Sequence, residues 1–221
     1  MKPYKKGILI FSGLVLLLIL VGCGRTAPSR FYTLSPVHSA LPTAAPGDMG
    51  KTSQTTIGIL PVEIPDYLDR PEIVTRKNDG GLSLEEYDRW GGDLRNDIAR
   101  VLGETLAAQL PRDRVTILTG RRSTPADYNI FVQVRRFEPI AGEKIWLRAQ
   151  WTVTEISGQT VLLRRDADLY EPIKGQGFPE TVAAMSHAVD RLGQEMVAAL
   201  KPALANSVRP KAGSEQDSTV Q

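Results

Sequence analysis

Three segments in which apolar and polar residues alternate dominate the second half of the chain. They cover residues 127–137, 143–156 and 159–171, and tight turns at Ala141-Gly142 and Ser157-Gly158-Gln159 separate them. In the middle segment every second residue from Ile145 to Val153 is apolar, while the residues between them are mostly polar. A period of two places successive side chains on opposite faces of a strand. The pattern therefore predicts an antiparallel meander with one buried and one wetter face.

Shorter β-rich segments precede this meander. They cover residues 31–36, 55–62, 72–77, 81–87 and 114–120. Between the third and the fourth of them lies Asp79-Gly80-Gly81, a strong turn signal that predicts a hairpin. Residues 37–54, rich in Pro, Ala, Ser and Gly, are expected to form a loop.

Two segments carry apolar residues at helical spacing. The first runs from Leu94 to Leu106, with Asp93 as the expected N-cap and Pro111 as the stop signal. The second covers residues 179–200, and its apolar side consists of Val182, Met185, Val189, Leu192, Met196 and Leu200. The chain order of strands, helix, strands and helix predicts an α+β fold, in which two helices pack on one face of a mixed or antiparallel sheet.

The N-terminus has the features of a bacterial lipoprotein signal peptide, which would cover residues 1–22. It begins with lysines, and an apolar run over residues 8–21 follows. This run is short for a membrane span, which needs roughly 20 residues. Small residues then precede Cys23, which is the lipobox pattern. In proteins with this signature the cysteine is lipidated and becomes the first mature residue. The alternative is an uncleaved N-terminal anchor with an incidental cysteine.

The rest of the chain is then organised as a tether, one domain and a tail. Residues 23–30 are the lipidated cysteine and tether, residues 31–204 a single periplasmic α+β domain, and residues 205–221 a polar, disordered tail. Seven residues after Cys23 reach at most roughly 25 Å, so the domain should stay close to its membrane. Aspartate after the cysteine often signals retention in the inner membrane. Gly24 stands there instead, which favours the outer membrane.

Removal of the signal would change the charge of the protein. Its three lysines leave without any acid, so the formal net charge falls from +2 for the whole chain to −1. This removes the global electrostatic case for nucleic-acid binding. Cys23 is the only cysteine, which excludes an intrachain disulfide, a thiolate nucleophile and a cysteine metal site. The covalent lipid is the only cofactor expected.

The sequence offers little catalytic chemistry. Its two histidines, His38 and His187, lie in the early loop and on the last helix. The patterns H-E-x-x-H and G-x-S-x-G do not occur, nor does a phosphate-binding glycine loop with a lysine. We therefore predict no catalytic or metal site and a protein that is not an enzyme. An envelope hydrolase is the remaining alternative.

Arginines crowd the meander, and the sequence allows two interpretations of them. They are Arg135, Arg136, Arg148, Arg164 and Arg165. One interpretation is a solvated face with cross-strand salt bridges to Glu143, Glu155 and Asp166. The other is a polar interface that docks an acidic partner or lipid headgroups, because arginine bonds bidentately and stacks on aromatic rings. Exposure of Trp146 on the same face would favour the interface.

The stretch IPDYLDRPEIVTR, residues 64–76, is too broken for a helix and too apolar for a simple linker. Its two prolines disfavour helix in the residues just before them, so the chain should run as strand, bend and strand. One interpretation is a kinked edge strand whose prolines deter edge pairing. The other is a shaped surface loop that contacts a partner or a second copy of the chain. Its contact residues would be Tyr67, Leu68 and Arg70, braced by Arg76.

Together, these motifs resemble those of the PqiC-type auxiliary lipoproteins. The resemblance rests on the lipobox at residues 20–23, RFYTL at 30–34, IGILPVEIPDYLDRPEIVTR at 57–76 and YDRWGGDL at 87–94. It covers most of the mature chain, and YLDRPEIVTR is its most specific part. The last motif adds Trp90 to the candidate contact residues.

The resemblance implies an outer-membrane lipoprotein that serves an MCE-type lipid transport system of the Gram-negative envelope. Such lipoproteins contact the periplasmic end of a tube- or ring-forming MCE-domain protein, whose base sits in the inner membrane. A homo-oligomeric ring follows by analogy. The alternative function is a lipid carrier with an apolar cavity between the sheet and the helices.

Overall fold

The computed structural model describes residues 28–37, 55–111, 115–119, 126–156 and 160–207. The predicted signal peptide, Cys23 and His38 lie outside these ranges, as do the start of the tether, most of the loop at 37–54 and the turn at 157–159. What the sequence predicts for those segments stays a prediction.

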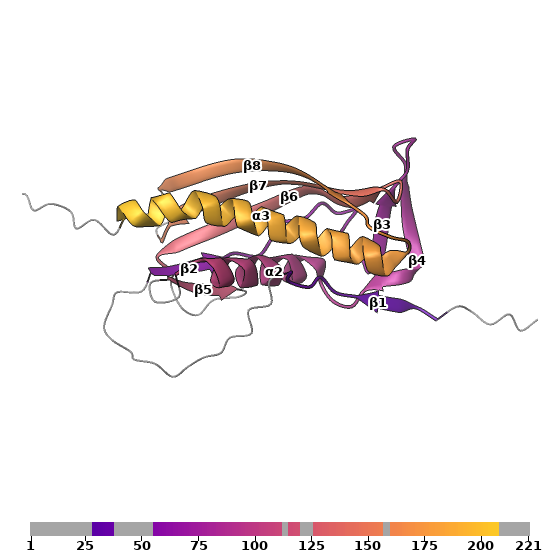
Figure 1. Ribbon diagram of the computed structural model, residues 1–221, viewed down its shortest axis with the longest axis horizontal. Helices are drawn as coiled ribbons and strands as arrows, with labels where there is room; N and C mark the ends of the chain where they lie inside the picture. The colour runs from indigo at the N-terminus through magenta and orange to yellow at the C-terminus, as the bar shows by residue number, and fades with distance from the viewer. Residues whose placement is uncertain (1–27, 38–54, 112–114, 120–125, 157–159, 208–221) are drawn as a thin grey trace, which may run out of the picture.

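The described strands form one mixed sheet (Figure 1). They are β1 (Arg30–Tyr32), β2 (Thr55–Ile59), β3 (Glu72–Arg76), β4 (Leu82–Trp90), β5 (Val115–Thr119), β6 (Tyr128–Ile140), β7 (Lys144–Glu155) and β8 (Val161–Pro172). Neighbours along the sheet run β1-β4-β3-β6-β2-β5, and β7 and β8 continue from the other edge of β6. The pairs β1·β4, β2·β5, β2·β6 and β3·β6 are parallel, and the others are antiparallel. The predicted α+β fold with a mixed sheet is confirmed.

The predicted hairpin and meander are both present. β3 and β4 pair antiparallel around the Asp79-Gly80-Gly81 turn, and Gly80 adopts a positive φ of 86° there. β6, β7 and β8 pair antiparallel in sequence order. Ala141 and Gly142 join the first two of them with φ values of 50° and 73°. Glycine adopts this left-handed conformation without steric cost, which explains the residue type at Gly142.

The described residues include two helices beside the sheet, α2 (Leu94–Gln109) and α3 (Phe178–Ser207). The Asp93 side chain accepts a hydrogen bond from the Arg95 N–H, as expected of an N-cap, and Leu110, just before a proline, is the C-cap. α3 runs seven residues beyond the predicted end at 200. The first three residues of the tail predicted to be disordered from residue 205 are therefore helical, through Ser207, although the helix contains Pro202.

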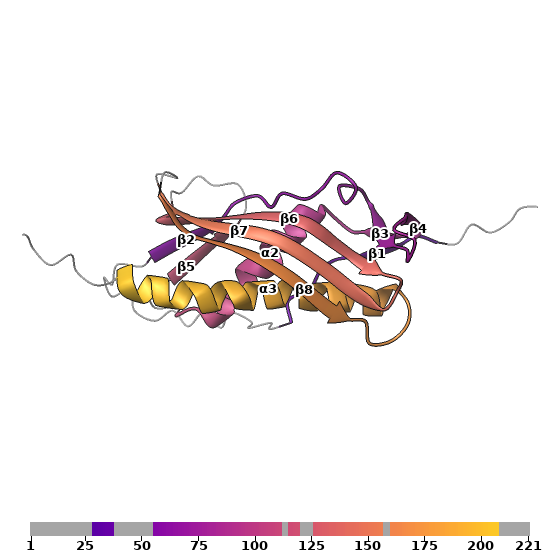
Figure 2. The same cartoon turned by 90° about the horizontal axis from the view of Figure 1, so that it is seen from above.

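Both helices lie on the same face of the sheet, as predicted: α3 packs against the meander, and α2 packs against β5 and α3. Alternate β7 residues point toward them and are buried: Ile145, Leu147, Ala149, Trp151 and Val153. The predicted apolar side of α3 is buried as well. Side chains such as Phe137 and Met185 occupy this layer, where the lipid-carrier alternative requires an apolar cavity. Figure 2 looks onto the other face of β6, β7 and β8, which no described helix covers and which we call the outer face.

The first strand is shorter than the sequence predicts. β1 ends at Tyr32, and the chain then leaves the sheet and runs between the helices. Leu34 is buried there, its N–H donates to Asp97 Oδ2 at 3.2 Å, and the Ser35 N–H donates to Ser186 Oγ at 3.0 Å. Side chains of the helices thus replace the strand hydrogen bonds, which local β propensity cannot reveal.

Candidate functional site

A buried carboxylate, Glu138 on β6, organises the stretch that the sequence singled out. Its side chain has no exposed surface. Tyr67 Oη donates to Glu138 Oε2 at 2.7 Å, and Arg76 Nε donates to Oε1 at 2.7 Å. The Phe137 N–H adds a third hydrogen bond, at 2.9 Å. Tyr67 and Arg76, both from YLDRPEIVTR, therefore bind the same acid, which lies more than 60 positions away in the sequence.

The pKa shifts of the partners reflect this burial. Desolvation is the main cause that raises the pKa of Tyr67 far above its ordinary value, and the hydrogen bond to Glu138 raises it further. For Arg76 desolvation acts to lower the pKa, but the hydrogen bond and charge of Glu138 outweigh it, so the pKa is raised. Arg136 Nη1 lies 3.6 Å from the same carboxylate. A buried negative charge is stable only when it is paired in this way.

A second buried acid, Asp88 on β4, joins two other motifs of the sequence. Arg30 Nη2 donates to Asp88 Oδ2 at 2.8 Å, and Tyr32 Oη donates to Oδ1 at 2.9 Å. Arg30 and Tyr32 come from RFYTL, and Asp88 comes from YDRW. The arrangement repeats that of Glu138, because one arginine and one tyrosine again bind opposite oxygens of a buried carboxylate. It holds β1, where the tether ends, to the edge of the sheet.

The bend between the two prolines of the stretch is a compact turn. The Leu68 N–H donates to the Pro65 carbonyl at 2.9 Å. Arg95 at the start of α2 binds both oxygens of Asp69, at 2.8 and 2.5 Å. The hydrogen bond from Arg95 lowers the pKa of Asp69. Side-chain and backbone contacts thus fix this loop against α2.

The structure separates the five predicted contact residues into three groups. Leu68 and Trp90 are only 3% and 5% exposed, so we correct their assignment: both side chains belong to the hydrophobic core, where burial of their apolar surface is favourable. Tyr67 and Arg76 are partly buried and bind Glu138. Arg70 alone is fully at the surface. The bracing role predicted for Arg76 has a physical basis, since it and Tyr67 share one acid.

An aromatic and cationic row crosses the outer face beside Glu138. The Arg136 guanidinium lies 4.2 Å from the centroid of the Trp146 ring. Trp146 stacks on Tyr170, with centroids 5.5 Å apart and planes 18° apart, and Lys144 Nζ lies 5.1 Å from the Tyr170 centroid. The Trp146 Nε1–H donates to Asp168 at 2.6 Å. Cation–π contacts and the hydrogen bond hold these rings at the surface. We call Arg136, Trp146, Tyr170 and Lys144 the aromatic ladder.

The ladder bears on the two interpretations of the meander arginines. In the described part of the chain, no ion pair joins those arginines to Glu143, Glu155 or Asp166. Arg136 pairs with Glu138 and Trp146 instead. Trp146 is partly exposed. This combination favours the polar interface over a purely solvated face.

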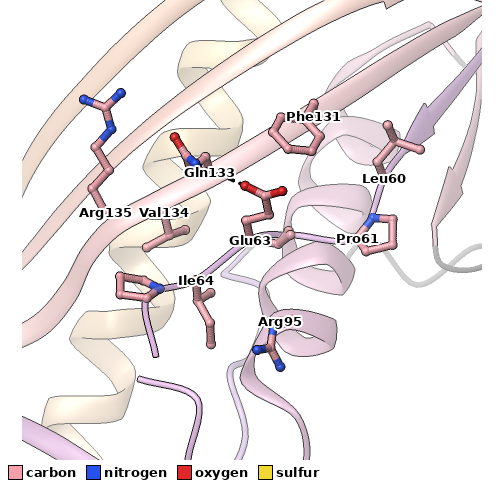
Figure 3. A pocket seen from close by; sticks show the side chains of 11 residues that line it. Leu60, Pro61, Glu63, Ile64, Arg95, Phe131, Gln133, Val134 and Arg135 are labelled. Carbon is pink, nitrogen blue, oxygen red and sulfur yellow. Dashed lines mark hydrogen bonds between the residues drawn. The ribbon is translucent and has the colours of Figure 1, made fainter. Parts of the chain in front are cut away.

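A groove of about 830 Å³ lies between residues 60–65 and β6 (Figure 3). Leu60, Ile64 and Phe131 give it apolar walls, and Glu63 accepts a hydrogen bond from Gln133 Nε2 at 3.1 Å across it. Arg95 from α2 and Arg135 from β6 stand on opposite sides in Figure 3. Apolar walls with a few polar groups are typical of a binding groove.

The described segments hold no metal-binding cluster, and one of the two histidines lies among them. No three His, Cys, Asp or Glu side chains among them gather closely enough to hold a metal ion. His187 is exposed on α3. None of the helices described is both long and apolar enough to cross a membrane.

Sequence reasoning missed the two acids that organise the motifs and the ring that completes the ladder. Asp88 and Glu138 look like ordinary strand charges, and Tyr170 like an ordinary strand aromatic. One signal was available: Glu138 stands in the run FEPI, between Phe137 and Pro139. An acid among apolar strand residues needs a partner when it is buried. The sequence did not identify Tyr67 and Arg76 as those partners.

Comparisons with known proteins agree with the resemblance seen in the sequence. The sequence model of one family, described as the ABC-type transport auxiliary lipoprotein component, matches residues 32–197. The crystal structure of protein XCC0632 from Xanthomonas campestris is similar, with 17% identity, a TM-score of 0.61, and coverage of 80% of this chain and 99% of that one. A crystal structure of an uncharacterised protein is similar with 16% identity, a TM-score of 0.64, and coverage of 79% and 99%. At these identities the two structures show a shared fold. A comparison with curated proteins finds no match.

Proposed function

Because the chain belongs to the family of ABC-type transport auxiliary lipoprotein components, we propose that it is the accessory subunit of an MCE-type lipid transport system. In this proposal Cys23 carries the lipid, the anchor lies in the outer membrane, and the domain faces the periplasm. The domain links the outer membrane to the periplasmic end of the conduit. It performs no chemistry on the lipid.

The lipobox and the short tether support the position of the domain. With Cys23 in the bilayer, residues 24–30 keep the sheet within roughly 25 Å of it. The ion pair of Arg30 with Asp88 fixes the end of this tether to β4. A domain held this close to a membrane is suited to receive the end of a conduit.

The groove beside β6 is the observation that carries the docking role. It is open to solvent, and its apolar walls are flanked by Arg95, which binds Asp69, and by Arg135. A guanidinium group can bind a carboxylate through two parallel hydrogen bonds. Exposed Arg70 lies on the same turn as Asp69, which binds Arg95 of the groove. We propose that an extended, acidic segment of the MCE-domain protein binds here.

Site-specific photocrosslinking in living cells tests this docking role. A photoreactive amino acid at Arg135, on the groove, should give an adduct that contains an MCE-domain protein. The same amino acid at His187, which is exposed on α3, is the matched control and should give none. If several groove positions produced no such adduct while Cys23 was lipidated, the docking proposal would be wrong.

Self-association into a ring is a second element of the proposal. Native mass spectrometry of the lipoprotein extracted in mild detergent measures it directly. A closed ring gives a single discrete oligomer. Monomers alone, at the concentrations found in the envelope, would contradict a ring.

A further inference from the structure

Exposed apolar side chains gather on the outer face at one end of the sheet. Leu82 is 40% exposed and Leu84 48% exposed on β4, and Tyr170 is 45% exposed on β8. Trp146 and Lys144 of the aromatic ladder lie between them on β7. We call these five residues the anchor-end patch.

Strand register places the members of this patch on one face. Leu82 pairs with Arg76, Arg76 with Ile140, and Ile140 with Lys144. Residues that face each other in neighbouring strands point to the same side of a sheet, and so do residues two apart in one strand. Leu84 therefore shares the face of Leu82. Trp146, two residues beyond Lys144, pairs with Tyr170 and lies on that face as well.

The same end of the sheet receives the tether. β1 pairs with β4, with Arg30 opposite Asp88, and Figure 1 shows β1, β3 and β4 together at this end. From Asp88 to Leu82 the strand extends about 20 Å, which is less than the roughly 25 Å that seven tether residues reach. A bilayer that holds Cys23 is therefore within reach of the patch.

The chemistry of the patch fits a lipid surface. Tryptophan and tyrosine concentrate at the level of the headgroups, where an apolar ring and a polar edge are both satisfied. Leucines on a strand near its turn can enter the acyl boundary, and Lys144 and Arg136 can contact phosphates. We propose that the anchor-end patch lies on the phospholipid bilayer and sets the orientation of the domain on it. This inference rests on the proposed lipid anchor at Cys23.

Intrinsic fluorescence tests the contact in the lipidated protein. Of its three tryptophans, Trp90 and Trp151 are buried, at 5% and 2% exposure, and Trp146 is accessible. The lipoprotein is reconstituted in vesicles of phosphatidylethanolamine and phosphatidylglycerol with brominated acyl chains. We expect the bromines to quench the emission, and Trp146→Phe to lose that quenching. Absent quenching, or quenching that the variant retains in full, would overturn the proposal.

A pair of leucines provides a matched control that does not depend on Trp146. With Cys23 lipidated, Leu84→Cys and Leu162→Cys each introduce a single free thiol for a fluorescent label. Leu162 is similarly exposed, at 43%, but lies eight residues from Tyr170 along β8, or about 27 Å. Spin-labelled lipid should quench the label at 84 and not the label at 162. Equal quenching at both positions, or none at either, would refute the patch.

The outcomes for the patch and for the docking role are separable. If the patch is not quenched while Arg135 still crosslinks to an MCE-domain protein, only this inference fails. If the patch is quenched without any such crosslink, only the docking role fails. If the mass of the N-terminal peptide shows an unmodified Cys23 thiol, the anchor and both proposals are wrong.

Discussion

Arg76 on β3 and Glu138 on β6 form an ion pair of 2.7 Å in which the carboxylate has no exposed surface. The two strands pair directly at only one position, Arg76 opposite Ile140. The side-chain contact therefore reinforces a short junction between the β3–β4 hairpin and the meander. The junction lies beside both the predicted family motif and the anchor-end patch.

Removal of the arginine should be costly. Arg76→Ala leaves Glu138 buried without its main counter-charge, and breaking such a pair typically costs about 3–5 kcal/mol. Glu138→Gln should be milder, because Arg76 keeps some access to water. Urea unfolding of both variants and of the double variant completes a mutant cycle. We expect the double variant to be more stable than Arg76→Ala; an additive cycle would show that the two side chains are not coupled.

Stability should fall at alkaline pH through Tyr67. Its folded-state pKa is raised above the unfolded value near 10, chiefly by burial. A raised pKa means that the unfolded chain loses the proton first. The stabilisation is therefore complete below about pH 10 and is lost progressively as the pH rises above it.

Substitution of Tyr67 tests whether stability falls in this direction with pH. Tyr67→Phe should cost about 2 kcal/mol at neutral pH, because a hydrogen bond to a charged group is lost. It should also flatten the decline above pH 10, as measured by urea unfolding at a series of pH values. Tyr170→Phe, at a tyrosine that is 45% exposed, is the control for loss of a hydroxyl and should leave the free energy of unfolding at neutral pH nearly unchanged. An unchanged alkaline slope in Tyr67→Phe would contradict the assignment.

Leu68 and Arg70 should behave oppositely although they are two residues apart. Leu68→Asp places a charge in the core and should abolish folding, and Leu68→Ala should cost about 2–5 kcal/mol. Arg70→Glu should stay within about 0.5 kcal/mol of the parent, as surface substitutions do, while reducing the crosslinks of the groove. Thermal unfolding monitored by circular dichroism separates them. If the Leu68→Asp variant folded, the core assignment would be wrong and Leu68 would again be a candidate surface contact.

The helix–helix contact should not tolerate a methyl group at Gly193. A Cβ there would lie 2.8 Å from Thr105 Cγ2 and 2.9 Å from its Cβ. Thr105 cannot turn away easily, because its hydroxyl donates to buried Asp190 at 2.8 Å. The expected overpacking cost of about 1–3 kcal/mol should exceed the gain of about 1 kcal/mol in helix propensity.

Gly103 provides the comparison for this prediction. A Cβ there would lie 2.3 Å from Thr119 Cγ2, but Thr119 is exposed and its side chain can rotate. Denaturant unfolding should therefore show Gly193→Ala to be less stable than Gly103→Ala. The reverse order would mean that α2 and α3 can separate more readily than their packing indicates.

The sequence by itself determined the elements and their faces. The alternation from Ile145 to Val153 fixed the buried side of β7, and the spacing from Leu94 to Leu106 fixed that of α2, because periodicity is a property of neighbouring residues. The Asp93 cap and the turn at Asp79 are equally local. The sequence did not determine where strands end. β1 ends before the predicted position, because side chains of the helices bind the backbone of the residues that follow it.

Tertiary structure alone decided which charges are buried and with whom they pair. Tyr67 and Arg76 stood out in the sequence, but the acid that binds them is 71 and 62 residues away. Leu68 looked like a surface contact until the bend folded it into the core. Such pairings depend on the register between β3 and β6, which arises when distant strands meet. A hydrophobic pattern shows which face of a strand is buried, but it does not specify which distant strand that face will meet.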